Sequence, residues 1–256
     1  MRLPRILRAA RKFLILLLFI WSTWAFFWSK EAGAQAEPST HANEVFLGYE
    51  WKEGVGFSEI DYALDSCRAS LAAWLWEKIF TLWEKKEWDE MAKLMEVVIW
   101  LQPHQILYAD QAAWQMAWNA SAAVLKDSNE AHRQEREHYY IQRGRAFLEE
   151  GISKNPGSSL LYEHLGLLLR DKLEDHLGAA EAFDQAAALP GAAPYLHRFA
   201  AYELTECPGR EQEGYDRLMA LYQEGKEQRM PMLLAKIKIL EEKRNSHKRA
   251  QKNTKK

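Results

Sequence analysis

The sequence predicts an all-α protein, and three observations support that fold class. Glycine and proline are scarce, with 13 and 8 copies in 256 residues, which disfavours a fold built from many tight turns. No run of β-branched residues is bounded by turn signals. From Ser58 onward, apolar residues recur at steps of three and four, which is the period of an amphipathic helix. The composition, 48% apolar and 27% charged, is that of a globular chain.

The first 29 residues have the composition of a targeting segment. Residues 1–12 carry basic side chains and no acidic one, so we expect them to form a cytoplasmic basic region. Residues 13–29, FLILLLFIWSTWAFFWS, contain no charge and reach the lower length limit for a membrane span, about 17 residues. The sequence therefore predicts a single-pass membrane protein with a cytoplasmic N-terminus and an exported body.

A cleaved signal peptide is the alternative interpretation of the same segment. The tripeptide Ala34-Gln35-Ala36 has the small-x-small form of a signal-peptidase site, and it follows basic and apolar regions in the right order. Cleavage near Ala36 would release a periplasmic or secreted protein. Residues 30–56 are mixed and polar, which predicts a linker and an irregular lead-in to the body.

The body, residues 57–244, is predicted to be a series of helices. Prolines at 103, 156, 190 and 208, most of them with a glycine nearby, mark the breaks between helices. The apolar period predicts a first helix from Ser58 to about Leu82, followed by helices at 88–101, 105–126, 131–153, 159–172, 176–188, 193–205, 210–224 and 231–244.

The segment Tyr162–Pro190, YEHLGLLLRDKLEDHLGAAEAFDQAAALP, resembles one tetratricopeptide (TPR) repeat. Its small residues Gly166 and Ala179 would let the paired helices approach closely, and Tyr162 and Phe183 would fill the gaps around them. The positions that match the pattern are Tyr162, Leu165, Gly166 and Leu169 in the first helix, Ala179, Phe183 and Ala186 in the second, and Pro190 at the end.

Weaker copies of the pattern start at Trp76, Trp114 and Tyr195, against an expected period of about 34 residues. The resemblance implies a right-handed α-solenoid of about four degenerate TPR-like helical hairpins. The stretch WLQPHQILYADQAAWQMAWN is also similar to membrane-anchored bacterial repeat proteins of unassigned function.

The end of the chain is predicted to form a cap and a tail. The apolar stripe of the helix at 231–244, with polar residues elsewhere, is typical of a terminal capping helix. That stripe consists of Leu233, Leu234, Ile237 and Leu240. Residues 245–256 are polar and basic, so we expect a disordered tail.

Charge is segregated along the chain. The chain has 34 basic and 36 acidic groups. Residues 1–44 hold six basic and three acidic groups, and residues 243–256 hold seven basic groups and no acidic one. The net charge of the middle of the chain is therefore about −12. A negative field disfavours nucleic acid as a partner of the main domain.

No catalytic or metal-binding pattern occurs, so we expect neither an enzyme nor a cofactor or metal site. The two cysteines, Cys67 and Cys207, lack the spacing of a zinc or redox motif and are predicted to pack in helix interfaces. His164 and His176 lie on either side of one predicted turn, where they could approach each other. The helical spacing of the tryptophans and tyrosines favours core packing over a sugar or cofactor platform.

The TPR resemblance also implies a binding face, because in that family first-helix residues next to the packing positions line a concave groove. Carried over by position, the candidate partner-binding residues are Glu77, Glu84, Gln115, Asn119, Glu163, Arg170 and Glu203. Such a groove would hold a neutral or basic peptide by hydrogen bonds; the alternative is that these are simply the polar sides of helices.

Three hypotheses for function follow. The first is a membrane-associated scaffold that mediates protein–protein interaction outside the cytoplasm. The second is a structural or assembly component that uses the acidic body and basic tail for self-association or for binding an anionic surface. The third is a periplasmic binding protein released by cleavage near Ala36. The sequence does not indicate the partner or the oligomeric state.

Overall fold

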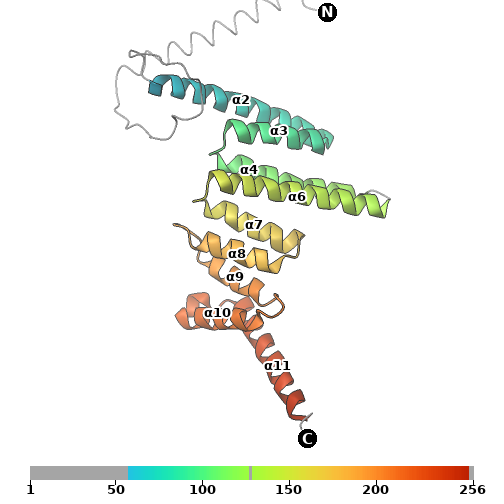
Figure 1. Cartoon of the computed structure of the whole chain (residues 1–256), viewed down its shortest axis with the longest axis vertical. Helices are drawn as coiled ribbons and strands as arrows, with labels where there is room; N and C mark the ends of the chain where they lie inside the picture. The colour runs from blue at the N-terminus through green and yellow to red at the C-terminus, as the bar shows by residue number, and fades with distance from the viewer. Residues whose placement is uncertain (1–56, 127–128, 254–256) are drawn as a thin grey trace, which may run out of the picture. The chain divides into compact units, whose positions relative to one another are not determined.

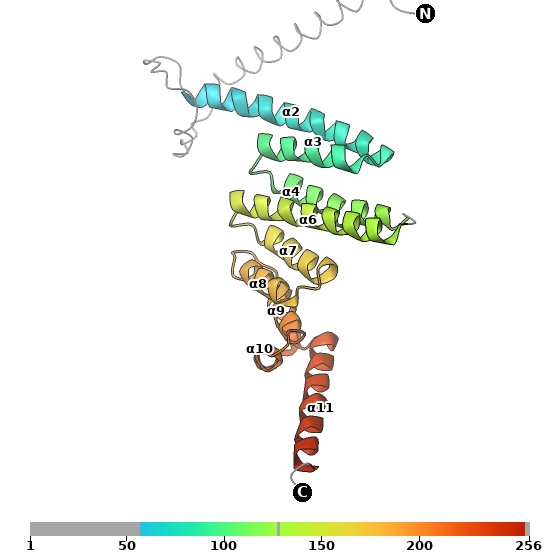
Figure 2. The same cartoon turned by 45° about the vertical axis from the view of Figure 1, so that its right-hand side comes forward.

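The computed structural model describes residues 57–126 and 129–253, and every regular element in them is helical (Figures 1 and 2). The chain divides into two compact units, Met1–Tyr62 and Ala63–Lys256, and the hairpins described below belong to the second. The helices are α2 (Phe57–Lys85), α3 (Trp88–Leu101), α4 (Ile106–Trp114), η1 (Gln115–Ala120), α5 (Ser121–Ala123), η2 (Val124–Lys126), α6 (Glu130–Lys154), α7 (Ser159–Lys172), α8 (His176–Ala187), α9 (Tyr195–Leu204), α10 (Glu211–Glu224), η3 (Lys226–Gln228) and α11 (Pro231–Asn253).

None of the described helices is both long and apolar enough to cross a membrane. The predicted basic region 1–12, span 13–29 and linker 30–56, with the cleavage site near Ala36, lie outside the described residues.

Consecutive helices form hairpins. The helix α4 packs on α6, α7 on α8, and α9 on α10, while α8 also packs on α9 and so joins two hairpins. We call α2, α4, α7 and α9 the first helices, and α3, α6, α8 and α10 the second helices. This alternation, with loops of a few residues, is consistent with a TPR-like helical repeat.

The α7–α8 hairpin closes as the sequence predicts. A Cβ placed on Gly166 would lie 2.6 Å from the Phe183 ring, so only a hydrogen atom fits between the two helices there. Phe183 and Ala179 are fully buried. The expected close approach at Gly166, filled by Phe183, is therefore confirmed.

The α4–α6 hairpin closes through glycines and alanines. A Cβ on Gly144 would lie 2.7 Å from Ala117 Cβ, and a Cβ on Gly151 would lie 2.7 Å from Ala109 Cβ. Small residues of α4 and η1 therefore face the glycines of α6. Trp114, expected at the first packing position of this unit, is instead 49% exposed. The expectation that Trp114 fills a packing position was wrong, because the small residues bring the two helices together without it.

The helix α2 buries less of its apolar stripe than expected. Ala72 and Ile79 belong to the core, whereas Leu64, Leu71 and Trp74 are 51%, 45% and 54% exposed. The reason is length: α3 is shorter than α2, and the core contacts of α2 run from Ala72 toward its C-terminal end. Cys67, predicted to pack in a helix interface, is exposed, while Cys207 is buried, and both are free thiols.

The predicted helix 105–126 is continuous but irregular. Its middle, η1, is a π-helical segment, and its last turn, η2, is a 3-10 helix. A π-helical turn rotates the following side chains relative to a regular α-helix. Apolar periodicity alone does not reveal such a rotation.

The last helix caps the body but extends further than predicted. Leu233 is fully buried, and Ile237 and Leu240 pack against the same cluster, as expected of a cap. Leu234 was assigned to the buried stripe but is 44% exposed. The helix α11 continues to Asn253 through residues that were predicted to be disordered. No proline or glycine stops it, and lysine, arginine, alanine and glutamine favour helix.

Candidate functional site

The first helices contact one another along one side of the body, and we call the surface they form the first-helix face. Trp76 of α2 packs on Tyr108 of α4, with ring centroids 5.0 Å apart. His164 of α7 pairs with Asp110 of α4. The Tyr195 hydroxyl of α9 donates to Glu163 Oε1 of α7 at 2.7 Å. These contacts connect α2, α4, α7 and α9 in order.

His164 and Asp110 form a hydrogen-bonded ion pair between two hairpins. Asp110 is only 8% exposed, so its carboxylate depends on the imidazole for its hydrogen bond. The hydrogen bond to Asp110 raises the pKa of His164 above its ordinary value, although burial acts in the opposite direction. The protonated imidazole is thus the form that this contact favours.

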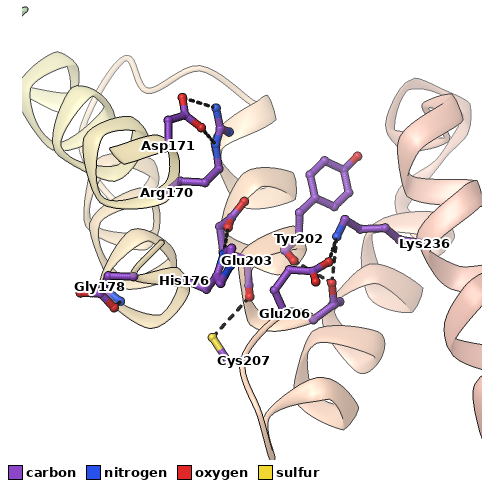
Figure 3. Close-up of polar contacts among 11 residues, drawn as sticks. Arg170, Asp171, His176, Gly178, Tyr202, Glu203, Glu206, Cys207 and Lys236 are labelled. Atoms are coloured by element: carbon purple, nitrogen blue, oxygen red, sulfur yellow. Dashed lines mark hydrogen bonds and ion pairs between the residues drawn. The ribbon is translucent and has the colours of Figure 1, made fainter. Parts of the chain in front are cut away.

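A second histidine–carboxylate pair joins α8 to α9 (Figure 3). His176 Nδ1 lies 2.8 Å from Glu203 Oε2, and Glu203 is 6% exposed. The Cys207 thiol donates to the Glu203 carbonyl at 3.3 Å, and burial raises the pKa of that thiol. A raised pKa keeps the thiol protonated, which lowers its nucleophilicity.

The two histidines that flank the predicted turn therefore do not meet. His164 turns toward α4, and His176 turns toward α9. In the part of the chain that the structure describes, no three His, Cys, Asp or Glu side chains are grouped as metal ligands.

Arg170 lies on the same face as Glu203 but binds a sequence neighbour (Figure 3). Its Nε donates to Asp171 Oδ1 at 2.6 Å, and this hydrogen bond raises the pKa of Arg170. Its guanidinium also lies 5.6 Å from the centroid of the Phe199 ring. The charge of Arg170 is thus already balanced within the chain.

Lys236 links α11 to the end of α9. Its ammonium donates to the Glu206 carboxylate and to Thr205 Oγ1, and it lies 5.9 Å from the Tyr202 ring centroid (Figure 3). The bond to Lys236 lowers the pKa of Glu206. This contact fixes α11 to the fourth hairpin at its N-terminal half.

The π-helical segment η1 carries two side-chain ladders. The rings of Trp114 and Trp118 stack with centroids 4.7 Å apart, and Lys172 of α7 lies 5.6 Å from the Trp118 ring. The Asn119 amide donates to Gln115 Oε1 at 2.6 Å. The half-exposed Trp114 is therefore not in the core, contrary to the expectation that the tryptophans serve core packing.

The seven predicted groove residues thus divide into two groups. Five are already hydrogen-bonded within the chain: Gln115, Asn119, Glu163, Arg170 and Glu203. The other two, Glu77 and Glu84 on α2, are exposed and have no hydrogen bond or ion pair among the described residues. The expectation that all seven are available to a peptide backbone stays a prediction, but only these two are unengaged.

Three exposed apolar residues lie on the first helices α2 and α4. Phe80 of α2 is 62% exposed, and Leu107 and Trp114 of α4 are 54% and 49% exposed. Leu107 and Trp114 are seven residues apart and share one face of α4. Sequence reasoning did not identify these three residues as exposed, because helical spacing alone does not distinguish the packed side of a helix from the open one.

A cleft of about 500 Å³ lies at the turn between α2 and α3. In it, Arg136 Nη2 donates to Asp89 Oδ2 at 3.0 Å, and the Tyr140 hydroxyl donates to Asp89 Oδ1 at 3.0 Å. Burial, together with the bond to Asp89, raises the pKa of Tyr140. These polar groups join α3 to α6. No sequence pattern predicted these contacts, because the partners are far apart in the chain.

Comparison with known proteins adds little. No protein-family model matches the chain, and no curated protein matches it. Among solved structures, the crystal structure of a protein named MamA is similar at 15% identity and a TM-score of 0.28, covering 65% of this chain and 95% of that one. At that identity and TM-score, the likeness carries no argument about function.

Proposed function

We propose that this chain is a non-enzymatic scaffold, a TPR-like α-solenoid that binds a protein partner on its first-helix face. The apolar segment 13–29 attaches it to a membrane, and the preceding basic residues keep the N-terminus in the cytoplasm, so that the helical body is exported. The support is the alternation of helices, the charge-free N-terminal segment and the composition of the first-helix face.

The observation that carries the proposal is the cluster of Phe80, Leu107 and Trp114. Two chain reversals separate α2 from α4, so the two helices run in the same direction, and Trp76 and Tyr108 lie level with each other. Phe80 is one turn after Trp76 and therefore lies near the turn of α4 between Leu107 and Trp114. Neighbouring exposed apolar groups with a polar surround are typical of protein-binding surfaces.

The test compares this cluster with an equally exposed apolar residue elsewhere. A photo-crosslinking amino acid at Trp114 should yield a specific adduct in cells of the host type, while the same amino acid at Trp100 should not. Trp100 is a matched control since it is 74% exposed but lies on the second helix α3. The adduct at Trp114 should also disappear on Phe80→Ala; equal adducts from both positions would refute the proposed face.

The hydrogen-bonding part of the face is tested separately. Changing Asn119 and Arg170 together to Ala should weaken partner recovery if they contact the partner. Unchanged recovery would remove these two residues from the binding face and leave the apolar cluster as its basis.

Membrane attachment is tested by N-terminal sequencing and fractionation of the full chain. An intact N-terminus in the membrane fraction, extracted only by detergent, would support the tethered scaffold. A soluble protein that begins near Glu37 would instead support the released periplasmic binder.

A further inference from the structure

The α7–α8 hairpin holds one histidine against each of its neighbouring hairpins. His164 of α7 bonds Asp110 of α4, and His176 Nδ1 of α8 lies 2.8 Å from Glu203 Oε2 of α9. Asp110 and Glu203 are 8% and 6% exposed, and they are the two buried acidic residues among those that the structure describes. Both of these buried carboxylates therefore meet a histidine, and both histidines belong to the same hairpin.

Other helices of the body are joined by arginine and lysine, which keep their charge at every pH near neutrality. A histidine, by contrast, gains or loses its charge at a pH of about 6.5. The pairs with permanent charges are Arg136–Asp89 between α6 and α3, Arg217–Asp184 between α10 and α8, and Lys236–Glu206 between α11 and the end of α9. Of all these contacts, only the two histidine pairs change their charge near neutral pH.

The surroundings of His164 favour its protonated form. The hydrogen bond to Asp110 raises the pKa of His164, and the negative charge of Glu163 on the same helix adds to this effect, although burial acts in the opposite direction. The Glu163 carboxylate also accepts from the Tyr195 hydroxyl of α9. Where α6 and α8 approach α7 most closely, the contacts are made by glycine, leucine and phenylalanine residues.

The junction around His176 contains more charges, but Glu203 is the one that bonds the imidazole (Figure 3). The other charged or titratable groups of this junction have hydrogen-bond partners of their own within the chain. They are Arg170, Asp175, Glu206, Cys207 and Lys236. Protonation of His176 therefore turns a neutral hydrogen bond to Glu203 into an ion pair.

We propose that pH controls how firmly the α7–α8 hairpin packs on its two neighbours, through His164 and His176. When both imidazoles are protonated, each neutralises a buried carboxylate of the adjacent hairpin, and the α7–α8 hairpin is held on both sides. When the imidazoles lose their protons, each junction keeps a hydrogen bond but loses the ion pair, so it opens more often. This control lies in the helical body and does not depend on the proposed partner face.

The two junctions respond in the same direction but to different degrees. The pKa of His164 is raised, so the free energy that its pair adds is complete below the unfolded pKa of histidine and is lost as pH rises through the folded pKa. The junction of α8 with the last hairpin responds less, because Arg217 of α10 also bonds Asp184 of α8 and keeps its charge.

Hydrogen–deuterium exchange of the full chain in mild detergent tests the proposal. Exchange is measured at about pH 5.5 and about pH 8, on either side of the ordinary histidine pKa of about 6.5, and is corrected for the intrinsic rate at each pH. Backbone amides of α4 and α7 should open about fivefold more often at the higher pH, the upper value for a partly exposed ion pair. Amides of α8 and α9 should respond in the same direction by a smaller factor.

Three variants identify the groups responsible. His164→Gln keeps a hydrogen-bond donor for Asp110 but does not titrate, so it should abolish the pH response of α4 and α7 and leave that of α8 and α9. His176→Gln should have the reciprocal effect. His197→Gln is the control, since it removes an exposed histidine of α9, and it should leave both responses unchanged.

The wild type alone can overturn the proposal, whatever happens to the variants. Corrected exchange that is the same at both pH values would show that the histidine pairs do not control the packing. A pH response that survives in both glutamine variants would assign it to other groups and would overturn the proposal as well. A misfolded variant is recognised by lost protection in α3, which carries neither pair.

Discussion

The contact between Gly166 and Phe183 makes a quantitative prediction about the α7–α8 hairpin. In Gly166→Ala the new Cβ would lie 2.6, 2.7 and 3.0 Å from three atoms of the Phe183 ring. Phe183 is fully buried and also packs on Phe199, with ring centroids 5.5 Å apart, so it cannot easily move away. Overpacking of this kind costs about 1–3 kcal/mol.

The net effect is smaller, because alanine favours helix over glycine by about 1 kcal/mol. Because two of the contacts are shorter than 3.0 Å, the overpacking cost should lie at the upper end of its range, about 2–3 kcal/mol, so we expect Gly166→Ala to lower the free energy of unfolding by about 1–2 kcal/mol. For a body of this size, that is a fall in Tm of about 2–8 °C, measured by circular dichroism of the full chain in mild detergent.

Two further variants identify the cause. Gly157→Ala adds a Cβ with no heavy atom within 4 Å, so it should leave Tm unchanged or raise it slightly. Phe183→Leu destabilises on its own by removing ring contacts, but it should reduce the additional cost of Gly166→Ala. A Gly166→Ala protein as stable as the wild type, or costs that simply add in the double variant, would refute the close-approach explanation.

Three other predictions concern pH, backbone strain and a buried hydroxyl. The hydrogen bond to Asp110 raises the pKa of His164 in the folded protein. The free energy that this pair adds to the folded state is therefore complete below the unfolded pKa of histidine and is lost as pH rises through the folded pKa. Denaturant titrations across that pH range should show the wild type losing its extra stability relative to His164→Gln. Glu174 has φ 52°, in the left-handed region, where a side chain strains the backbone. Glu174→Gly should therefore raise the free energy of unfolding by about 1 kcal/mol in the same assay. An unchanged free energy of unfolding would contradict backbone strain at this residue. Tyr140→Phe leaves Asp89 without one of its donors and should cost about 1 kcal/mol; an unchanged midpoint would show that the hydrogen bond adds nothing.

The sequence predicted the helices well because prolines and glycines mark the breaks between them. The helix at 159–172 ends where predicted, and the glycine and phenylalanine of its hairpin meet as expected. The exposure of Trp114 in the second hairpin was missed, since Ala109 and Ala117 pack opposite Gly151 and Gly144 and close the helices without it. A single sequence gives little indication of which small residues lie at a helix contact. A tryptophan, by contrast, is easily matched to a packing position even when its side chain is exposed.

The binding face was harder to predict than the fold, for a physical reason. Position in a repeat says which side of a helix a residue occupies, but not whether a neighbouring hairpin supplies its hydrogen-bond partner. Glu163 and Glu203 illustrate this, because Tyr195 and His176, distant in sequence, engage their carboxylates. These two carboxylates of the predicted groove are therefore already hydrogen-bonded within the chain.

The use proposed for the first-helix face predicts a weak response to salt. Five of the seven predicted polar residues are engaged within the chain, so a partner that binds around Phe80, Leu107 and Trp114 gains mainly from apolar burial. Salt hardly weakens apolar burial, whereas it screens exposed charges beyond about 10 Å at 0.1 M. Partner crosslinking at Trp114 should therefore persist when the salt concentration is raised. Crosslinking that falls steeply with salt would instead show that charged groups carry the contact.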